Sequence, residues 1–142
     1  MYQDPETVQE NMKQLGISNS ITTVNHLIPD QQGAEGADMF IQKPEYLKAY
    51  ALYFKKFIEA YRSKGIRIEM VAPQNEFNSC QVFPSCIWTA ESLSRFVGTY
   101  LGPEMQKLGV KILFGTMERK NDLMIDTVMK SEAEKYVSAI GF

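Results

Sequence analysis

The chain has 142 residues, of which 44% are hydrophobic and 23% charged, a composition typical of one globular domain. Its 15 basic and 17 acidic side chains leave a net charge of −2, which argues against a nucleic-acid partner held by a basic surface. No apolar run reaches the roughly 20 residues that span a bilayer, and the first residues have neither the basic nor the apolar region of a signal peptide, so we expect neither in this chain.

The first 43 residues predict one short helix and little other regular structure. Asp4-Pro5 is a typical helix start, and Val8, Met12 and Leu15 follow at helical spacing before Gly16. Residues 17–43 show no sustained period. We therefore treat residues 1–43 as an irregular N-terminal segment and residues 44–142 as the second part of the chain.

Residues 44–73 predict a helix followed by a strand. Apolar and aromatic side chains recur every three or four residues from Leu47 to Tyr61, which indicates an amphipathic helix that begins at Pro44 and ends at Gly65. Ile66 to Ala72 alternates as a strand does, and Pro73 closes it. Residues 74–88 are expected to form a loop.

The rest of the chain repeats this alternation. Thr89 is a plausible N-cap of a helix that runs to Gly109, with Gly102-Pro103 expected to break or kink it. Val110 to Phe114 predicts a second strand, and residues 122–129 and 132–137 predict two short helices. Residues 139–142 look like the beginning of a third strand.

Strands that alternate with helices predict an α/β fold with a parallel sheet, which needs cover on both faces. Two and a half strands cannot form such a core alone. The pattern therefore favours a segment of a larger α/β protein, although a small complete domain with a three-stranded sheet stays open as an alternative.

The stretch Val71 to Phe77 is the most informative for chemistry. Gln74, Asn75 and Glu76 follow a predicted strand, and in α/β barrels the carboxyl ends of the strands carry the catalytic groups. A glutamate there can act as a general acid when burial raises its pKa, and an asparagine can donate to a sugar hydroxyl. The alternative is that these are ordinary turn residues.

Several motifs in the order of this chain support the first interpretation. They are Tyr50 to Tyr61, Gly65-Ile66, Pro73 to Glu76, Phe83-Pro84-Ser85, Trp88 to Glu91, and Tyr100 to Pro103. Together, over residues 44–142, they resemble glycoside hydrolase family 30, which includes glucosylceramidases, β-1,6-glucanases and xylanases. The chain departs from the family pattern at Phe77, where a proline is usual.

The resemblance implies a segment of a (β/α)8 TIM barrel covering about strands 4 to 6. It assigns the acid/base role of a retaining β-glycosidase to Glu76 and a sugar 2-hydroxyl contact to Asn75. The nucleophile of the family lies near the end of the seventh strand, outside this chain, so the chain alone is expected to be inactive. The resemblance further implies a β-linked carbohydrate substrate, no cofactor, and an extracellular or periplasmic location.

Other side chains near Glu76 have open roles. Gln74, Phe77 and Trp88 are candidate substrate contacts, although Trp88 equally fits a core position before the predicted helix. Cys80 and Cys86 could form a disulfide or stay as two thiols, and two cysteines with one histidine are too few for a four-ligand zinc site. The alternative functions are a non-catalytic carbohydrate-binding or interaction module, and an unrelated α/β domain.

Overall fold

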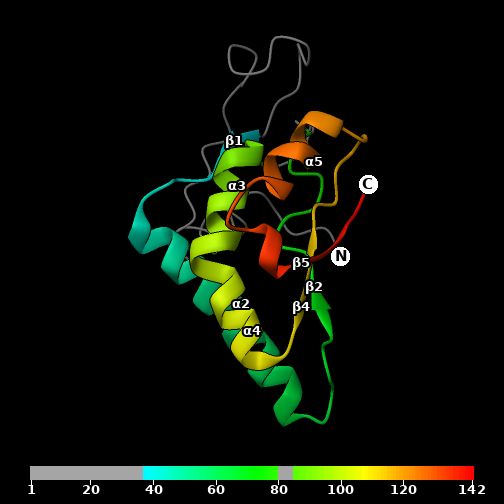
Figure 1. Ribbon diagram of the computed structural model, residues 1–142. Helices are drawn as coiled ribbons and strands as arrows, with labels where there is room; N and C mark the ends of the chain where they lie inside the picture. Colours follow the sequence, from blue (N-terminus) through cyan, green and yellow to red (C-terminus); the bar gives the residue numbers. More distant parts are fainter. Residues whose placement is uncertain (1–36, 80–84) are drawn as a thin grey trace.

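The computed structural model describes residues 37–79 and 85–142 (Figure 1). The helix predicted after Asp4-Pro5 lies outside the described residues. Within the described ranges, no helix combines the length and the apolar character that a bilayer span requires.

The long helix α2 (Pro44–Ser63) begins and ends close to the predicted residues. Pro44 lies in the first turn, where its missing N–H costs no hydrogen bond, and Arg62 lies in the last turn, where its charge is favourable. Gly65 follows with a φ of 77°, and its N–H donates to the Arg62 carbonyl at 3.0 Å. The buried face of α2 consists of Leu47, Ala51 and Ile58.

A second rod is built from α3 (Ala90–Phe96), the π-helical segment η2 (Val97–Leu101) and α4 (Gly102–Leu108). The predicted N-cap is confirmed, because the Thr89 side chain accepts a hydrogen bond from the Ser92 N–H at 3.1 Å. The three segments follow one another as a single rod in Figure 1.

The irregularity predicted at Gly102-Pro103 takes the form of a wider turn instead of a break. Pro103 has no N–H to donate to the preceding turn. The N–H of Gly102 reaches back to the carbonyl of Val97, which is the π-helical spacing, so the rod continues through this point. A side chain at position 102 would collide with the ring of Tyr136, which packs against the rod here.

The predicted parallel sheet is confirmed. β2 (Met70–Val71), β4 (Lys111–Phe114) and β5 (Val137–Ile140) pair in the order β2-β4-β5, all parallel. The strand expected over residues 66–72 shortens to two residues, and the strand expected over residues 139–142 begins two residues earlier. β5 ends at Ile140, and the N–H of Gly141 still donates to the carbonyl of Phe114 at 3.0 Å, which extends the contact with β4 by one hydrogen bond.

Two short strands were not predicted. β1 (Ala37–Met39) and β3 (Ser85–Ile87) form a separate parallel pair. Three residues are too few to show a period-2 pattern, so the sequence gives no signal for them. The pair joins the described end of the N-terminal segment to the loop that follows β2.

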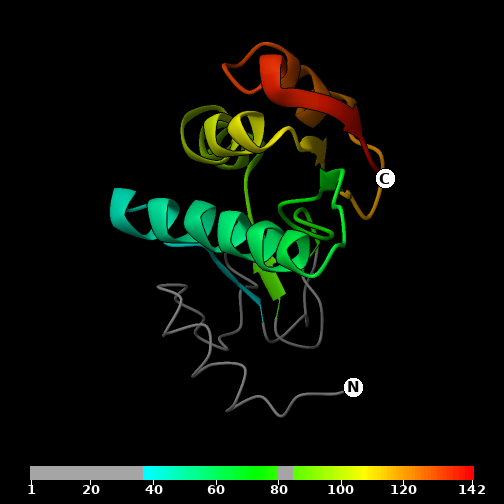
Figure 2. The same ribbon diagram turned by 90° about the horizontal axis from the view of Figure 1, so that it is seen from below.

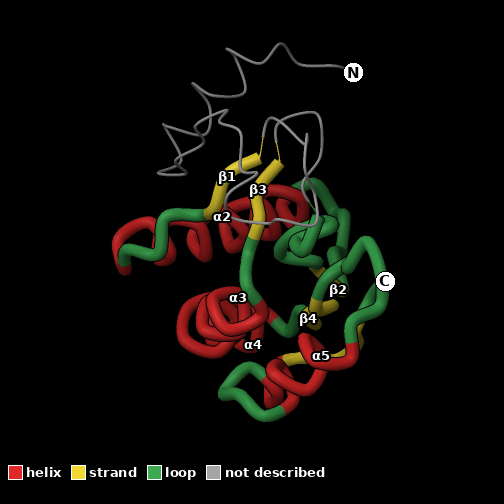
Figure 3. The backbone as a smooth tube through the Cα atoms, turned by 90° about the horizontal axis from the view of Figure 1, so that it is seen from above, coloured by secondary structure: helices red, strands yellow, loops and turns green. Residues whose placement is uncertain are grey.

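The helices lie on one side of the three-stranded sheet. Figure 3 shows α2, the α3–α4 rod and α5 (Asp122–Met129) arranged on the same side of β2 and β4, and Figure 2 shows α2 and the rod as two neighbouring helices from below. A short 3-10 turn, η3 (Glu134–Tyr136), precedes β5. This is the arrangement of consecutive β/α units in a barrel wall.

A cluster of stacked aromatic rings occupies the core between α2 and the rod. The ring centroids of Phe40 and Trp88 are 4.6 Å apart, and the ring of Tyr50 lies 5.1 Å from both Phe40 and Phe96. These contacts bury large apolar surfaces and fix α2 against α3.

Candidate active site

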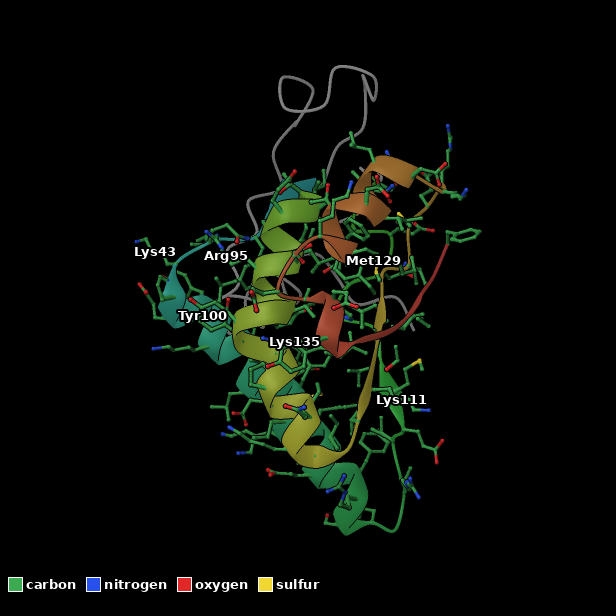
Figure 4. All side chains as sticks on the ribbon, in the orientation of Figure 1. Lys43, Arg95, Tyr100, Lys111, Met129 and Lys135 are labelled. Atoms are coloured by element: carbon green, nitrogen blue, oxygen red, sulfur yellow. The ribbon has the colours of Figure 1, made fainter. Side chains whose placement is uncertain are left out.

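The carboxyl ends of the three parallel strands meet at one end of the sheet. Lys111, at the start of β4, lies at the lower end of the sheet in Figure 4, whereas Met129 of α5 lies higher up. The segments that follow β2, β4 and β5 therefore share the upper end, where the sequence predicts the site.

The segment after β2 is anchored to α2 before it reaches Glu76. Pro73 is buried, and its carbonyl accepts a hydrogen bond of 2.7 Å from the hydroxyl of Tyr50. Burial raises the pKa of this hydroxyl above its usual range, so it stays protonated and donates at neutral pH. This contact fixes where the loop leaves the strand.

Glu76 has a strained backbone. Its φ of 46° lies in the left-handed region, and it is the single non-glycine residue with a positive φ in the described ranges. Its carbonyl accepts from the N–H of Ser79 at 2.9 Å, which closes a tight turn. Such strain costs about 1–3 kcal/mol and is concentrated at active sites and ligand clamps. The strain therefore supports a functional role for Glu76, which is partly exposed.

Asn75 and Glu76 are both tied to Thr116, which follows β4. The Thr116 hydroxyl donates to Asn75 Oδ1 at 2.8 Å, and the N–H of Glu76 approaches Thr116 Oγ1 at 3.4 Å. Gln74 is half-buried, and its Nε2 donates to the backbone carbonyl of Asn75 at 3.1 Å. The predicted trio is thus held together by hydrogen bonds within the loop and across to β4.

Two glycines bring the ends of β4 and β5 close together. Gly115 has a φ of 107°, and a Cβ there would lie 2.7 Å from the carbonyl oxygen of Gly141. The same carbonyl accepts from the N–H of Met117 at 2.9 Å. Gly115 is therefore needed both for its positive φ and for the close approach, and it sets the position of the adjacent Thr116.

Phe77 and Trp88 are core residues in this structure. They are 0% and 1% exposed, and the N–H of Trp88 donates to the carbonyl of Phe77 at 2.9 Å. The ring of Phe77 packs edge-on against Phe114, with centroids 5.5 Å apart. Their role as substrate contacts stays a prediction, and neighbouring residues cover almost the whole surface of both side chains.

Sequence reasoning missed Thr116 and Asn78. Asn78 Oδ1 accepts from the N–H of Glu118 at 2.9 Å, so it links the β2 loop to the β4 loop as Thr116 does. A usable signal was present, because polar residues that follow neighbouring parallel strands meet at the same edge.

Other carboxylates lie elsewhere. Glu69 precedes β2 and forms an exposed 3.5 Å ion pair with Arg67, and the side chain of Glu118 is exposed. The described residues contain no cluster of histidine, cysteine, aspartate or glutamate side chains that could hold a metal ion. Cys86 is buried and Cys80 lies outside the described residues, so the choice between a disulfide and two thiols stays open.

A cavity of about 390 Å³ lies between the start of α3 and α5. Trp88, Leu123 and Met124 contribute to its lining, whereas Asn75 and Glu76 do not. The predicted catalytic residue therefore lies on a partly open surface of this chain and not in this cavity.

Comparison with known proteins gives a consistent result. A family model described as "Glycosyl hydrolase family 30 TIM-barrel domain" matches residues 22–142, starting before residue 44, where the sequence analysis placed the resemblance. The putative glucosylceramidase 1 of Caenorhabditis elegans is 34% identical over 106 residues. The endo-1,6-beta-D-glucanase of Neurospora crassa is 26% identical over 99 residues. Each match covers 68% of this chain, and the chain spans about a fifth of the length of these relatives.

Solved structures show the same fold. An endo-β-1,6-glucanase, BT3312, superposes with a TM-score of 0.62 at 28% identity, covering 74% of this chain and 24% of that protein. The structure of SrfJ from Salmonella typhimurium superposes with a TM-score of 0.61 at 20% identity over the same shares, which speaks for the fold alone.

Proposed function

Since this chain belongs to glycosyl hydrolase family 30, we propose that it supplies the acid/base half of a retaining β-glycosidase site, with Glu76 as the acid/base. In this proposal β2, β4 and β5 are strands 4, 5 and 6 of the barrel. The family membership and the parallel order β2-β4-β5 support this numbering.

The strained backbone of Glu76 is the observation that carries the proposal. A φ of 46° is unfavourable for glutamate, and glycine would adopt it without the clash between Cβ and the backbone. A carboxylate that occupies a position suited to glycine, at the carboxyl end of a parallel strand, is typical of a residue retained for chemistry.

The proposed reaction is a double displacement. Glu76 protonates the glycosidic oxygen while a second carboxylate attacks the anomeric carbon, which releases the leaving group and forms a glycosyl-enzyme. Glu76, now ionised, then removes a proton from the water that hydrolyses this intermediate, so it ends the cycle protonated again. This chemistry needs neither a metal nor an organic cofactor.

The second carboxylate must lie about 5–5.5 Å from Glu76 for retention of configuration. Glu69 lies before β2, at the other end of the strand, and Glu118 is an exposed residue of the β4 loop. The chain spans about a fifth of the length of its relatives, and we propose that it acts as part of a longer polypeptide, referred to below as the complete barrel, which supplies the nucleophile. Residues 1–142 alone are then expected to show no turnover.

The proposed substrate is a β-linked glucoside. The relatives named above are a putative glucosylceramidase and an endo-1,6-beta-D-glucanase, and each of these names refers to a substrate that contains glucose. The exposed Asn75 amide is proposed to contact the sugar 2-hydroxyl, with Gln74 supporting the loop. The family further suggests a location of the complete barrel outside the cell or in the periplasm.

The test compares Glu76→Gln with Glu69→Gln in the complete barrel, using kcat/KM as the readout of the first chemical step. On an alkyl β-glucoside, whose leaving group needs a proton, Glu76→Gln is expected to lose about 10²–10⁴-fold. On 2,4-dinitrophenyl β-glucoside, whose leaving group departs as the anion, the loss should be small. Glu69→Gln should leave both rates unchanged. Equal losses of Glu76→Gln on both substrates would contradict the acid role, and no loss on either would favour a binding module.

A further inference from the structure

The hydroxyl of Thr116 connects the two residues of the proposed site. It donates to Asn75 Oδ1 at 2.8 Å, and the N–H of Glu76 approaches it at 3.4 Å. Thr116 is half-buried, lies just after β4, the strand next to β2, and is held in place by the close approach of Gly115 to Gly141. It therefore connects the end of β4 to the loop that follows β2.

This contact decides which way the Asn75 carboxamide faces. The group is planar, with a carbonyl oxygen that accepts and an NH₂ that donates on opposite sides. Because the Thr116 hydroxyl donates a hydrogen bond to the carboxamide oxygen of Asn75, the NH₂ group faces away from Thr116. Asn75 is exposed, so its two N–H donors are available on the open side of the loop.

We propose that Thr116 is a positioning residue that holds the Asn75 carboxamide with its N–H donors directed at a substrate hydroxyl. This inference rests on the proposed glycosidase function. Without the threonine hydroxyl, the carboxamide loses its fixed orientation and can turn its acceptor oxygen toward the sugar. The substrate hydroxyl then loses a preorganised donor, which weakens binding in the transition state.

The role of Thr116 can be separated from simple packing by its dependence on the substrate. A packing residue affects all substrates alike. A residue that acts through Asn75 affects only substrates that carry the hydroxyl which Asn75 contacts. A 2-deoxy β-glucoside lacks that hydroxyl, so its hydrolysis should not depend on the orientation of Asn75.

The experiment measures kcat/KM of the complete barrel on a β-glucoside and on its 2-deoxy analogue. Thr116→Val, which keeps the shape and removes the hydroxyl, is expected to lose about tenfold on the β-glucoside, the effect of one hydrogen bond. It should lose less than about twofold on the 2-deoxy analogue. Thr116→Ser keeps the hydroxyl and should restore the parent rate within about twofold. Thr127→Val is the matched control, since the Thr127 hydroxyl donates to the Leu123 carbonyl within α5.

The outcomes distinguish the inference from the function on which it rests. If Glu76→Gln is inactive on the alkyl glucoside but Thr116→Val keeps full activity, the inference fails and the function stands. Equal losses of Thr116→Val on both substrates would also overturn it, in favour of packing or of a role through the Glu76 N–H. If Glu76→Gln is fully active, the function itself fails. Thr116→Ala removes the same hydroxyl without the bulk of valine, and it replaces Thr116→Val in the comparison if that variant does not fold.

Discussion

The left-handed backbone of Glu76 predicts an unusual order of stability among substitutions at this position. At ordinary positions, replacing alanine by glycine destabilises a protein by about 0.5–1 kcal/mol, because glycine loses more backbone freedom on folding. At a φ of 46° alanine carries the cost of the left-handed conformation, about 1–2 kcal/mol, whereas glycine does not.

The balance of these two effects gives the expected magnitude. Relief of about 1–2 kcal/mol, less the entropy cost of about 0.5–1 kcal/mol, makes Glu76→Gly more stable than Glu76→Ala by up to about 1.5 kcal/mol. Both variants remove the same carboxylate, so the loss of charge cancels in the comparison. Glu69, which does not have a positive φ, is the matched control, and there the glycine variant should be the less stable one.

The assay is urea unfolding of the complete barrel carrying Glu76→Gly, Glu76→Ala, Glu69→Gly or Glu69→Ala, followed by far-UV circular dichroism. The result that would refute the reasoning is Glu76→Gly less stable than Glu76→Ala by the same margin as at Glu69, since it would mean that Glu76 is not strained.

Two further substitutions test the contacts that shape the site. Gly115→Ala should destabilise the chain by about 1 kcal/mol more than Gly65→Ala. Both alanines carry the cost of a positive φ, but only the alanine at position 115 places its Cβ 2.7 Å from a carbonyl oxygen, that of Gly141. Equal thermal shifts of the two variants would contradict this. Tyr50→Phe should cost about 1 kcal/mol by removing the 2.7 Å bond to Pro73. Because burial raises the pKa of the Tyr50 hydroxyl, the unfolded chain releases this proton at a lower pH than the folded chain does. The free energy of unfolding should therefore fall as the pH rises above about 10, and fall less steeply in Tyr50→Phe. The same pH dependence in both proteins, measured by urea unfolding, would count against the raised pKa.

The elements with strong local signals could be predicted from the sequence. Pro44 and Gly65 mark the ends of α2, and Thr89 caps α3 as expected, because proline, glycine and capping side chains act within one turn. The parallel sheet followed from the alternation of helices and strands. These features depend on neighbours along the chain, which a sequence shows directly.

Features that depend on contacts across the fold were missed. The pairing of β1 with β3 involves three residues on each side, too few for a pattern. Tyr136, more than 30 residues away in the chain, packs its ring where a side chain at Gly102 would stand. Sequence reasoning expected a kink there because it could weigh the proline but not the packing that keeps the rod continuous.

The candidate site was predicted in part. Asn75 and Glu76 were singled out because they follow a predicted strand and lie among motifs that resemble glycoside hydrolase family 30. The structure adds the strain at Glu76 and the link to Thr116. Neither addition has a local signature, since a positive φ at glutamate and a hydrogen bond between two loops arise from the arrangement of β2 beside β4. The burial of Phe77 and Trp88 likewise depends on the tertiary core.

Azide rescue of Glu76→Gln in the complete barrel tests the central claim most directly. Azide needs no general base, so it should attack the glycosyl-enzyme formed from 2,4-dinitrophenyl β-glucoside, restore turnover and release β-glucosyl azide. This product is expected only if Glu76 is the acid/base of a retaining enzyme. Release of α-glucosyl azide would instead identify Glu76 as the nucleophile, and no response to azide would contradict a catalytic role for Glu76 in a double displacement.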